Sequence, residues 1–215
     1  MSADLSPLSS TLILVHAGIG GLALGAGFAA LLSAKGGRVH RLAGRGFAGS
    51  MLLSMLLSIP AIAERGNLLL ALVGPFTAWM VLRGWRVFAV QKGGEGPLDR
   101  LLALVPWIAG LGLLALGAWV SVRQGSPLGF GGVAIGLGAV SLLLGRGPSR
   151  PADRSAAVRA HIAAMVGALI AAVTAVVSVN LSDSGLPLLA LWLGPTALGV
   201  PVIIAFSRRF APVRA

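Results

Sequence analysis

The first long apolar run constrains this chain more than any other feature. Residues 11–34 carry no formal charge other than the one that His16 can gain. An α-helix rises about 1.5 Å per residue, so this run is long enough to cross a hydrocarbon core about 30 Å thick. Hydrocarbon offers backbone polar groups no water to bond, and a helix satisfies them internally. The run therefore predicts a membrane-spanning helix.

The composition places the whole chain in the same class. Of its 215 residues, 56% are hydrophobic and 11% are charged, whereas an ordinary soluble domain has about 25% charged residues. The sequence contains no Cys, which excludes disulfides, thiolate metal ligands and cysteine nucleophiles. The first ten residues contain no Lys or Arg, so we expect the first helix to remain as an anchor rather than to be removed as a signal peptide.

Seven apolar segments, bounded by charged or turn-forming residues, predict seven helices. They span residues 10–34, 43–63, 67–90, 100–121, 127–145, 157–179 and 186–207. Five prolines lie inside these segments. A proline has no N–H, so it leaves a backbone carbonyl of the preceding turn without a donor, and in a bundle neighbouring groups can bond that carbonyl instead. These prolines, where we expect kinks, are Pro60, Pro75, Pro106, Pro195 and Pro201. The prediction is an all-α, polytopic membrane protein whose seven-helix bundle forms a single transmembrane domain, residues 1–215.

The distribution of basic residues predicts the orientation of the helices. One alternate set of connections holds 15 of the 17 Lys and Arg residues, and the other set holds Arg65 and Arg123. Basic residues are retained on the cytoplasmic side of a membrane, so we expect the N-terminus outside and the C-terminus in the cytoplasm. Anionic lipid headgroups are the expected partners on that side. The basic residues expected to contact them are Lys35, Arg38, Arg41, Arg45, Arg83, Arg86, Arg208 and Arg209.

Nucleic acid is not an expected partner, because the basic residues form short clusters between apolar runs rather than one basic face.

A histidine, a serine and a Gly-Pro pair recur in the same order about 120 residues later in the chain. The pairs are His40 and His161, Ser58 and Ser178, and Gly74 and Gly194. This pattern predicts a parallel 3+1+3 repeat, that is, two repeats of three helices each with one helix between them. Residues 10–90 would match residues 127–207, and helix 100–121 would join them.

The three histidines are the candidate site residues, because ionisable groups at membrane depth are costly unless they are paired. His16 lies about one and a half turns inside the outer end of the first helix. It either bonds to a carbonyl or hydroxyl of a neighbouring helix, or has a ligand, cofactor or proton-relay role. About 20 Å along the membrane normal separates His16 from the other two histidines, so it is a separate candidate on the outer side.

His40 and His161 begin the second and sixth helices, both on the cytoplasmic side, and Met165 follows His161 by one helical turn. Two imidazoles and a thioether can ligate the iron of haem b or a copper ion. The alternative is that each histidine caps its helix or contacts lipid headgroups. The sequence therefore leaves a cofactor or metal site at His40, His161 and Met165 as one of two interpretations.

No catalytic residues are predicted. The sequence contains no HExxH motif, no Ser/His/Asp triad and no paired membrane carboxylates, and we expect all six acidic residues in connections. This favours a protein that is not an enzyme and disfavours proton-coupled transport. The glycine pairs Gly21/Gly25 and Gly132/Gly136 predict faces at which helices pack closely.

Three stretches of the chain carry recognisable motifs: residues 16–51, GPFTAWMVLRGWRVF at 74–88, and RAHIAAM at 159–165. The first contains a basic turn of the form KxGxxHRxxGR, made by Lys35, Gly37, His40, Arg41, Gly44 and Arg45, and the last contains a His-Met motif, His161 and Met165. In these motifs the chain resembles a large family of uncharacterised bacterial membrane proteins, the domain of unknown function 2306. Ala163 and Ala164 replace the bulky or charged residues of that later motif. The resemblance implies a multi-pass protein of the bacterial inner membrane and brings no established activity.

Three classes of function remain open. The first is a structural or auxiliary subunit of a larger membrane complex, which other membrane proteins or further copies of this chain would complete. The second is a redox or metal-binding membrane protein that uses His40 and His161. The third is a small-molecule transporter on the parallel-repeat plan, which needs a polar cavity at mid-membrane.

Overall fold

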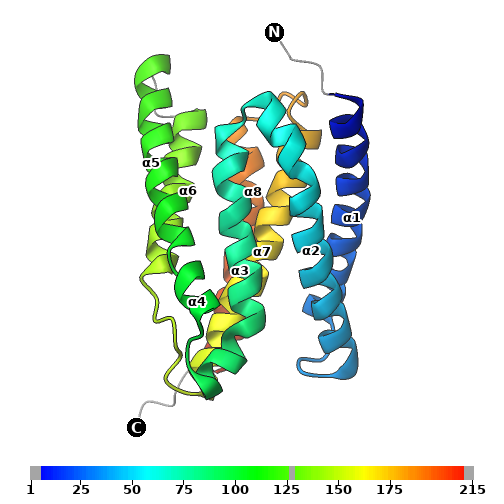
Figure 1. Ribbon diagram of the computed structural model, residues 1–215, viewed down its shortest axis with the longest axis vertical. Coiled ribbons are helices and arrows are strands. Elements are labelled where there is room, and N and C mark those ends of the chain that lie inside the picture. The colour runs from blue at the N-terminus through cyan, green and yellow to red at the C-terminus, as the bar shows by residue number, and fades with distance from the viewer. Residues whose placement is uncertain (1–5, 126–128, 211–215) are drawn as a thin grey trace. The chain divides into compact units, whose positions relative to one another are not determined.

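A computed structural model describes residues 6–125 and 129–210, and within these ranges it contains helices and no strand (Figure 1). The described residues form eight helices. These are α1 (Pro7–Leu32), α2 (Arg38–Arg65), α3 (Leu68–Gly93), α4 (Pro97–Leu102), α5 (Val105–Gln124), α6 (Phe130–Gly145), α7 (Arg154–Asn180) and α8 (Leu188–Arg208). Six segments of the described chain are long and apolar enough to cross a membrane, with α4 and α5 counted as one segment, and α6 is a shorter apolar helix. The structure therefore confirms the prediction of an all-helical chain with several segments that could span a membrane.

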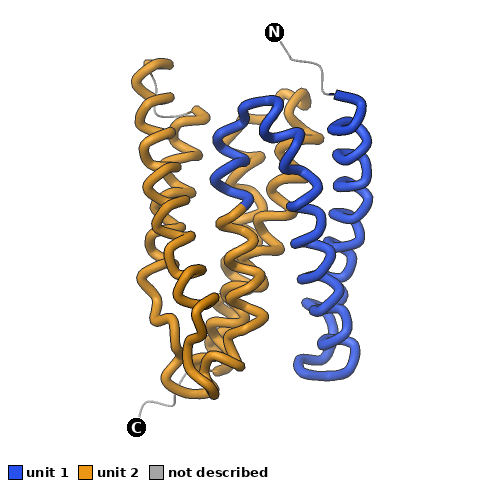
Figure 2. The backbone as a smooth tube through the Cα atoms, in the orientation of Figure 1, with its two compact units in different colours: residues 1–74 blue, residues 75–215 orange. Residues whose placement is uncertain are grey.

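The chain divides into two compact units (Figure 2), residues Met1–Gly74 and Pro75–Ala215, with the boundary inside α3. In unit 1, α1 and α2 pack along each other. In unit 2, α5 packs along α6 and α7 packs along α8. Each of these pairs is consecutive in the chain, as short connections favour. The single domain and the 3+1+3 repeat stay predictions.

The helix predicted over residues 100–121, with a kink at Pro106, is divided in the structure into two helices that form one apolar span. Helix α4 ends at Leu102, and α5 begins at Val105. Pro106 lies in the first turn of α5. It has no N–H to bond the carbonyl of Leu102, and its ring fits the first turn of a new helix. The proline expected to kink one helix thus separates two.

The second helix begins at Arg38, five residues before the predicted start at 43. Most of the residues that were assigned to a basic turn therefore form the first two turns of α2. The connection itself is short, and Gly36 turns the chain with φ +75°, a conformation that glycine adopts without steric cost. Other predicted bounds lie within a few residues of the observed ones, and the predicted start of the fifth helix at 127 lies outside the described residues.

Four of the five internal prolines lie inside continuous helices, as expected: Pro60 in α2, Pro75 in α3, and Pro195 and Pro201 in α8.

The tight contact between α5 and α6 depends on glycines. A methyl group built on Gly117 would lie 2.6 Å from the carbonyl oxygen of Gly131, and one built on Gly138 would lie 2.8 Å from that of Gly110. Backbone thus meets backbone at two levels, seven residues apart on each helix.

Of the glycines predicted to form packing faces, Gly21, Gly25 and Gly136 have open space around them. Methyl groups built on Gly21, Gly25 or Gly136 would meet no neighbouring atom within 4 Å. Three of the four predicted glycines therefore lie away from any helix contact of the described chain.

Candidate functional site

His16 is bonded to Ser54 across the α1–α2 contact of unit 1. Its Nδ1 lies 2.7 Å from the carbonyl oxygen of Ser54 and 2.9 Å from Ser54 Oγ, and that hydroxyl donates to the carbonyl of His16 at 3.1 Å. A carbonyl can only accept, so Nδ1 carries a proton and donates it to Ser54. Ser54 is 3% exposed. The pair joins two membrane helices by reciprocal bonds, which is the first of the two interpretations drawn from the sequence.

Glu64, in the last turn of α2, joins the end of that helix to the start of α1. Its carboxylate accepts from the backbone N–H of Ser6 at 3.0 Å and from the hydroxyls of Ser6 and Ser9 at 2.7 Å each. Ser9 is fully buried. The expectation that every acidic residue lies in a connection is wrong here, because Glu64 belongs to the helix. A serine pair at a helix start, far along the chain from one Glu, gives no sequence signal for this contact.

His40 lies in the first turn of α2, and its Nδ1 is 2.9 Å from the carbonyl oxygen of Ala30 near the end of α1. Lys35 donates to carbonyls of the same helix end, including those of Ala30 and Leu31, and Arg41 donates to the carbonyl of Gly36. Helix C-termini leave such carbonyls without helical partners and carry partial negative charge. These three basic side chains of unit 1 therefore stabilise the α1–α2 turn.

His161 and Met165 lie on α7 in unit 2, and both contact Gly84 of α3. His161 Nδ1 is 2.8 Å from the carbonyl oxygen of Gly84, and a methyl group built on Gly84 would lie 2.8 Å from Met165 Sδ. The imidazole also packs against the Phe88 ring, with 5.4 Å between centroids. Histidine and methionine are thus side by side, as their spacing predicts, and both serve a close crossing of two helices.

All three histidines share one arrangement, with Nδ1 directed at a backbone carbonyl of a neighbouring helix. In a neutral ring the lone pair then resides on Nε2, and metal-ligating histidines are commonly held in this way. His40 belongs to unit 1, whereas His161 and Met165 belong to unit 2. Among the described residues, no group of three or more His, Asp or Glu side chains has the geometry of a metal site.

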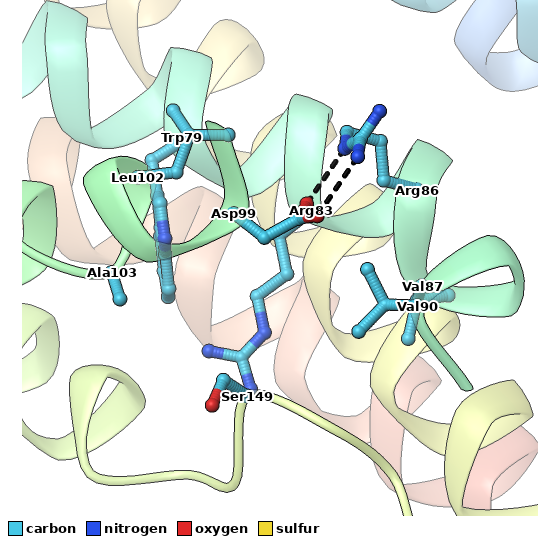
Figure 3. Close-up of a pocket in the computed structure, with 9 residues that line it drawn as sticks. All are labelled: Trp79, Arg83, Arg86, Val87, Val90, Asp99, Leu102, Ala103 and Ser149. Carbon is cyan, nitrogen blue, oxygen red and sulfur yellow. Dashed lines mark hydrogen bonds and ion pairs between the residues drawn. The ribbon is translucent and has the colours of Figure 1, made fainter. Parts of the chain in front are cut away.

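Arg86 of α3 forms a two-bond ion pair with Asp99 of α4 (Figure 3). Nε lies 2.7 Å from one carboxylate oxygen and an Nη lies 2.8 Å from the other. Asp99 also accepts from the backbone N–H of Gly96, which caps α4. The side chains of Arg86 and Asp99 are 37% and 11% exposed. The sequence assigned Arg86 to lipid headgroups and gave no partner for it.

Arg83 lies one turn before Arg86 on α3 and points toward Ser149 (Figure 3). Its guanidinium donates to the carbonyls of Pro148 at 2.9 Å and Leu144 at 3.4 Å, and it stacks over Trp79 at 5.1 Å. The other residues expected at headgroups, Arg38, Arg45, Arg208 and Arg209, are exposed. Arg209 stacks over the Phe206 ring at 5.4 Å.

The chain matches no protein-family model, no curated protein sequence and no solved structure. Its resemblance to the domain of unknown function 2306 family stays a prediction that rests on the motif residues alone.

Proposed function

We propose that this chain is a non-catalytic structural or auxiliary subunit of a larger membrane complex. The observation that carries the proposal is how the polar side chains within each unit are used. His16 and Glu64 join α1 to α2, His161 joins α7 to α3, and the buried Ser141 of α6 donates to the carbonyl of Pro106 in α5 at 2.8 Å. Polar groups that hold helices together in this way favour a scaffold.

The outer surfaces of the helices support the same proposal. Helix α1 exposes Leu14, Leu22 and Phe28, and α8 exposes Leu193 and Leu198. In a membrane, lipid chains or apolar faces of other spanning helices cover such surfaces, and close helix contacts there are driven by packing and by small residues. The proposed location is the bacterial inner membrane, with the C-terminus in the cytoplasm, as the basic residues favour.

Isolation of the tagged full-length chain in native membrane patches, without detergent, tests the subunit proposal. We expect another membrane protein, or further copies of this chain, to co-isolate in fixed stoichiometry. An unrelated seven-helix protein, tagged and expressed at the same level, is the control for non-specific capture. A stable monomer that keeps its helical content and binds nothing in fixed proportion would contradict the proposal.

A further inference from the structure

A pocket of about 440 Å³ lies within unit 2, in the size range of about 300–1,000 Å³ that is typical of ligand sites. It is bordered by α3, the end of α6, the connection to α7, the first half of α7 and the end of α8. Most of its walls are apolar, from residues such as Met80, Leu143, Ala160 and Ala163. Such walls are suited to a hydrocarbon chain.

The charged residues in the walls are two arginines, Arg83 and Arg159, and none of the described residues that line the pocket is acidic. Arg83 is half-buried and bonds to the carbonyls of Leu144 and Pro148. Arg159 is half-buried and bonds to Ser155 Oγ at 2.8 Å and to the carbonyl of Phe210. Both guanidinium groups are therefore held at the pocket by bonds to neutral groups.

Removing a guanidinium from water is costly unless an anion compensates for the lost solvation. The ion pair formed by described residues joins Arg86 to Asp99 and includes neither Arg83 nor Arg159. Carbonyl oxygens carry only partial charges, so two positive charges beside one apolar pocket remain to be balanced. Two planar guanidinium groups on different helices match the several oxygens of a phosphate.

The position of the pocket indicates where that phosphate comes from. Leu144 and Ser207 lie at the last turns of α6 and α8, and Arg159 lies in the second turn of α7. Ends of membrane helices lie at the depth of lipid headgroups. We propose that this pocket binds an anionic phospholipid, with its phosphate on Arg83 and Arg159 and part of an acyl chain along the alanine face of α7. The site requires no partner protein, so it is independent of the subunit proposal.

Native mass spectrometry of the delipidated full-length chain tests the site. The chain is titrated with phosphatidylglycerol and with phosphatidylcholine that carries the same acyl chains. We expect tighter binding of phosphatidylglycerol, weakened about tenfold or more by Arg83→Gln or Arg159→Gln, since bonds to charged groups are worth at least that factor. Arg146→Gln removes the same charge from an exposed residue outside the pocket, and we expect it to change the affinity less than twofold.

Because Arg83 also holds the α6–α7 connection, a second variant keeps both charges. Ala163→Phe fills the pocket, and we expect it to abolish tight phosphatidylglycerol binding without a change in charge. Equal binding of the two lipids, or full binding by Ala163→Phe and both arginine variants, would overturn the proposal. Displacement of the lipid by an equal concentration of inorganic phosphate would identify free phosphate as the ligand and would equally overturn the lipid assignment.

Discussion

The Gly117→Ala variant is expected to be less stable than the parent protein by about 1–3 kcal/mol, the usual cost of overfilling a tight contact. The added methyl group would lie 2.6 Å from the carbonyl oxygen of Gly131 and 2.8 Å from the backbone N of Ile135. Both atoms belong to the backbone of α6 and cannot rotate away as a side-chain end can. Helices α5 and α6 must therefore separate along their whole contact.

Thermal unfolding in detergent, followed by circular dichroism, measures this effect. Gly136→Ala is the matched control, because a methyl group there meets nothing within 4 Å. Alanine is the better helix former by about 1 kcal/mol, so the control is expected to keep or raise the melting temperature. Equal melting temperatures of the two variants would show that α5 and α6 do not touch at Gly117.

The difference between Gly117 and Gly136 also shows which part of the fold can be predicted from the sequence and which part cannot. Apolar length and turn residues locate the helices, because the hydrocarbon thickness imposes both. The face by which a helix packs depends on its partner as well. Helix α6 offers several glycine faces, and α5 selects Gly131 and Gly138 because Gly117 and Gly110 stand opposite them. A single segment of sequence does not contain that information.

The candidate site residues also include some partners that the sequence could predict and others that it could not. His16 was selected because a lone imidazole inside an apolar run needs a partner, and the structure provides Ser54. The Arg86–Asp99 pair was missed because Asp99 was placed in the connection before the helix predicted at 100–121, and Arg86 was assigned to lipid headgroups. In the structure Asp99 lies in the first turn of the short helix α4 and bonds Arg86. Long-range partners such as Pro148 for Arg83 likewise follow from tertiary packing.

Thiol labelling of intact cells is expected to give an all-or-none answer on topology. The chain contains no Cys, so single cysteines at Ala34, Ala152 and Ser182, all exposed residues in connections, report without background. With seven spans and the N-terminus outside, a membrane-impermeant maleimide is expected to label Ser182→Cys. Ala34→Cys and Ala152→Cys are expected to react only after the cells are permeabilised.

Helix α6 decides the outcome, because its 16 residues extend only about 24 Å, short of the hydrocarbon thickness of about 30 Å. If α6 does not cross, and the N-terminus is still outside, Ala152 is labelled, whereas Ala34 and Ser182 are protected. That topology would place eight basic residues on the cytoplasmic side and nine on the outer side. It would therefore lack the excess of basic residues that is typical of the cytoplasmic side. A seven-span chain in the opposite orientation would label Ala34 and Ala152 together. Labelling of Ser182 alone is therefore expected, because it is the pattern in which α6 crosses and 15 of the 17 basic residues lie on the cytoplasmic side.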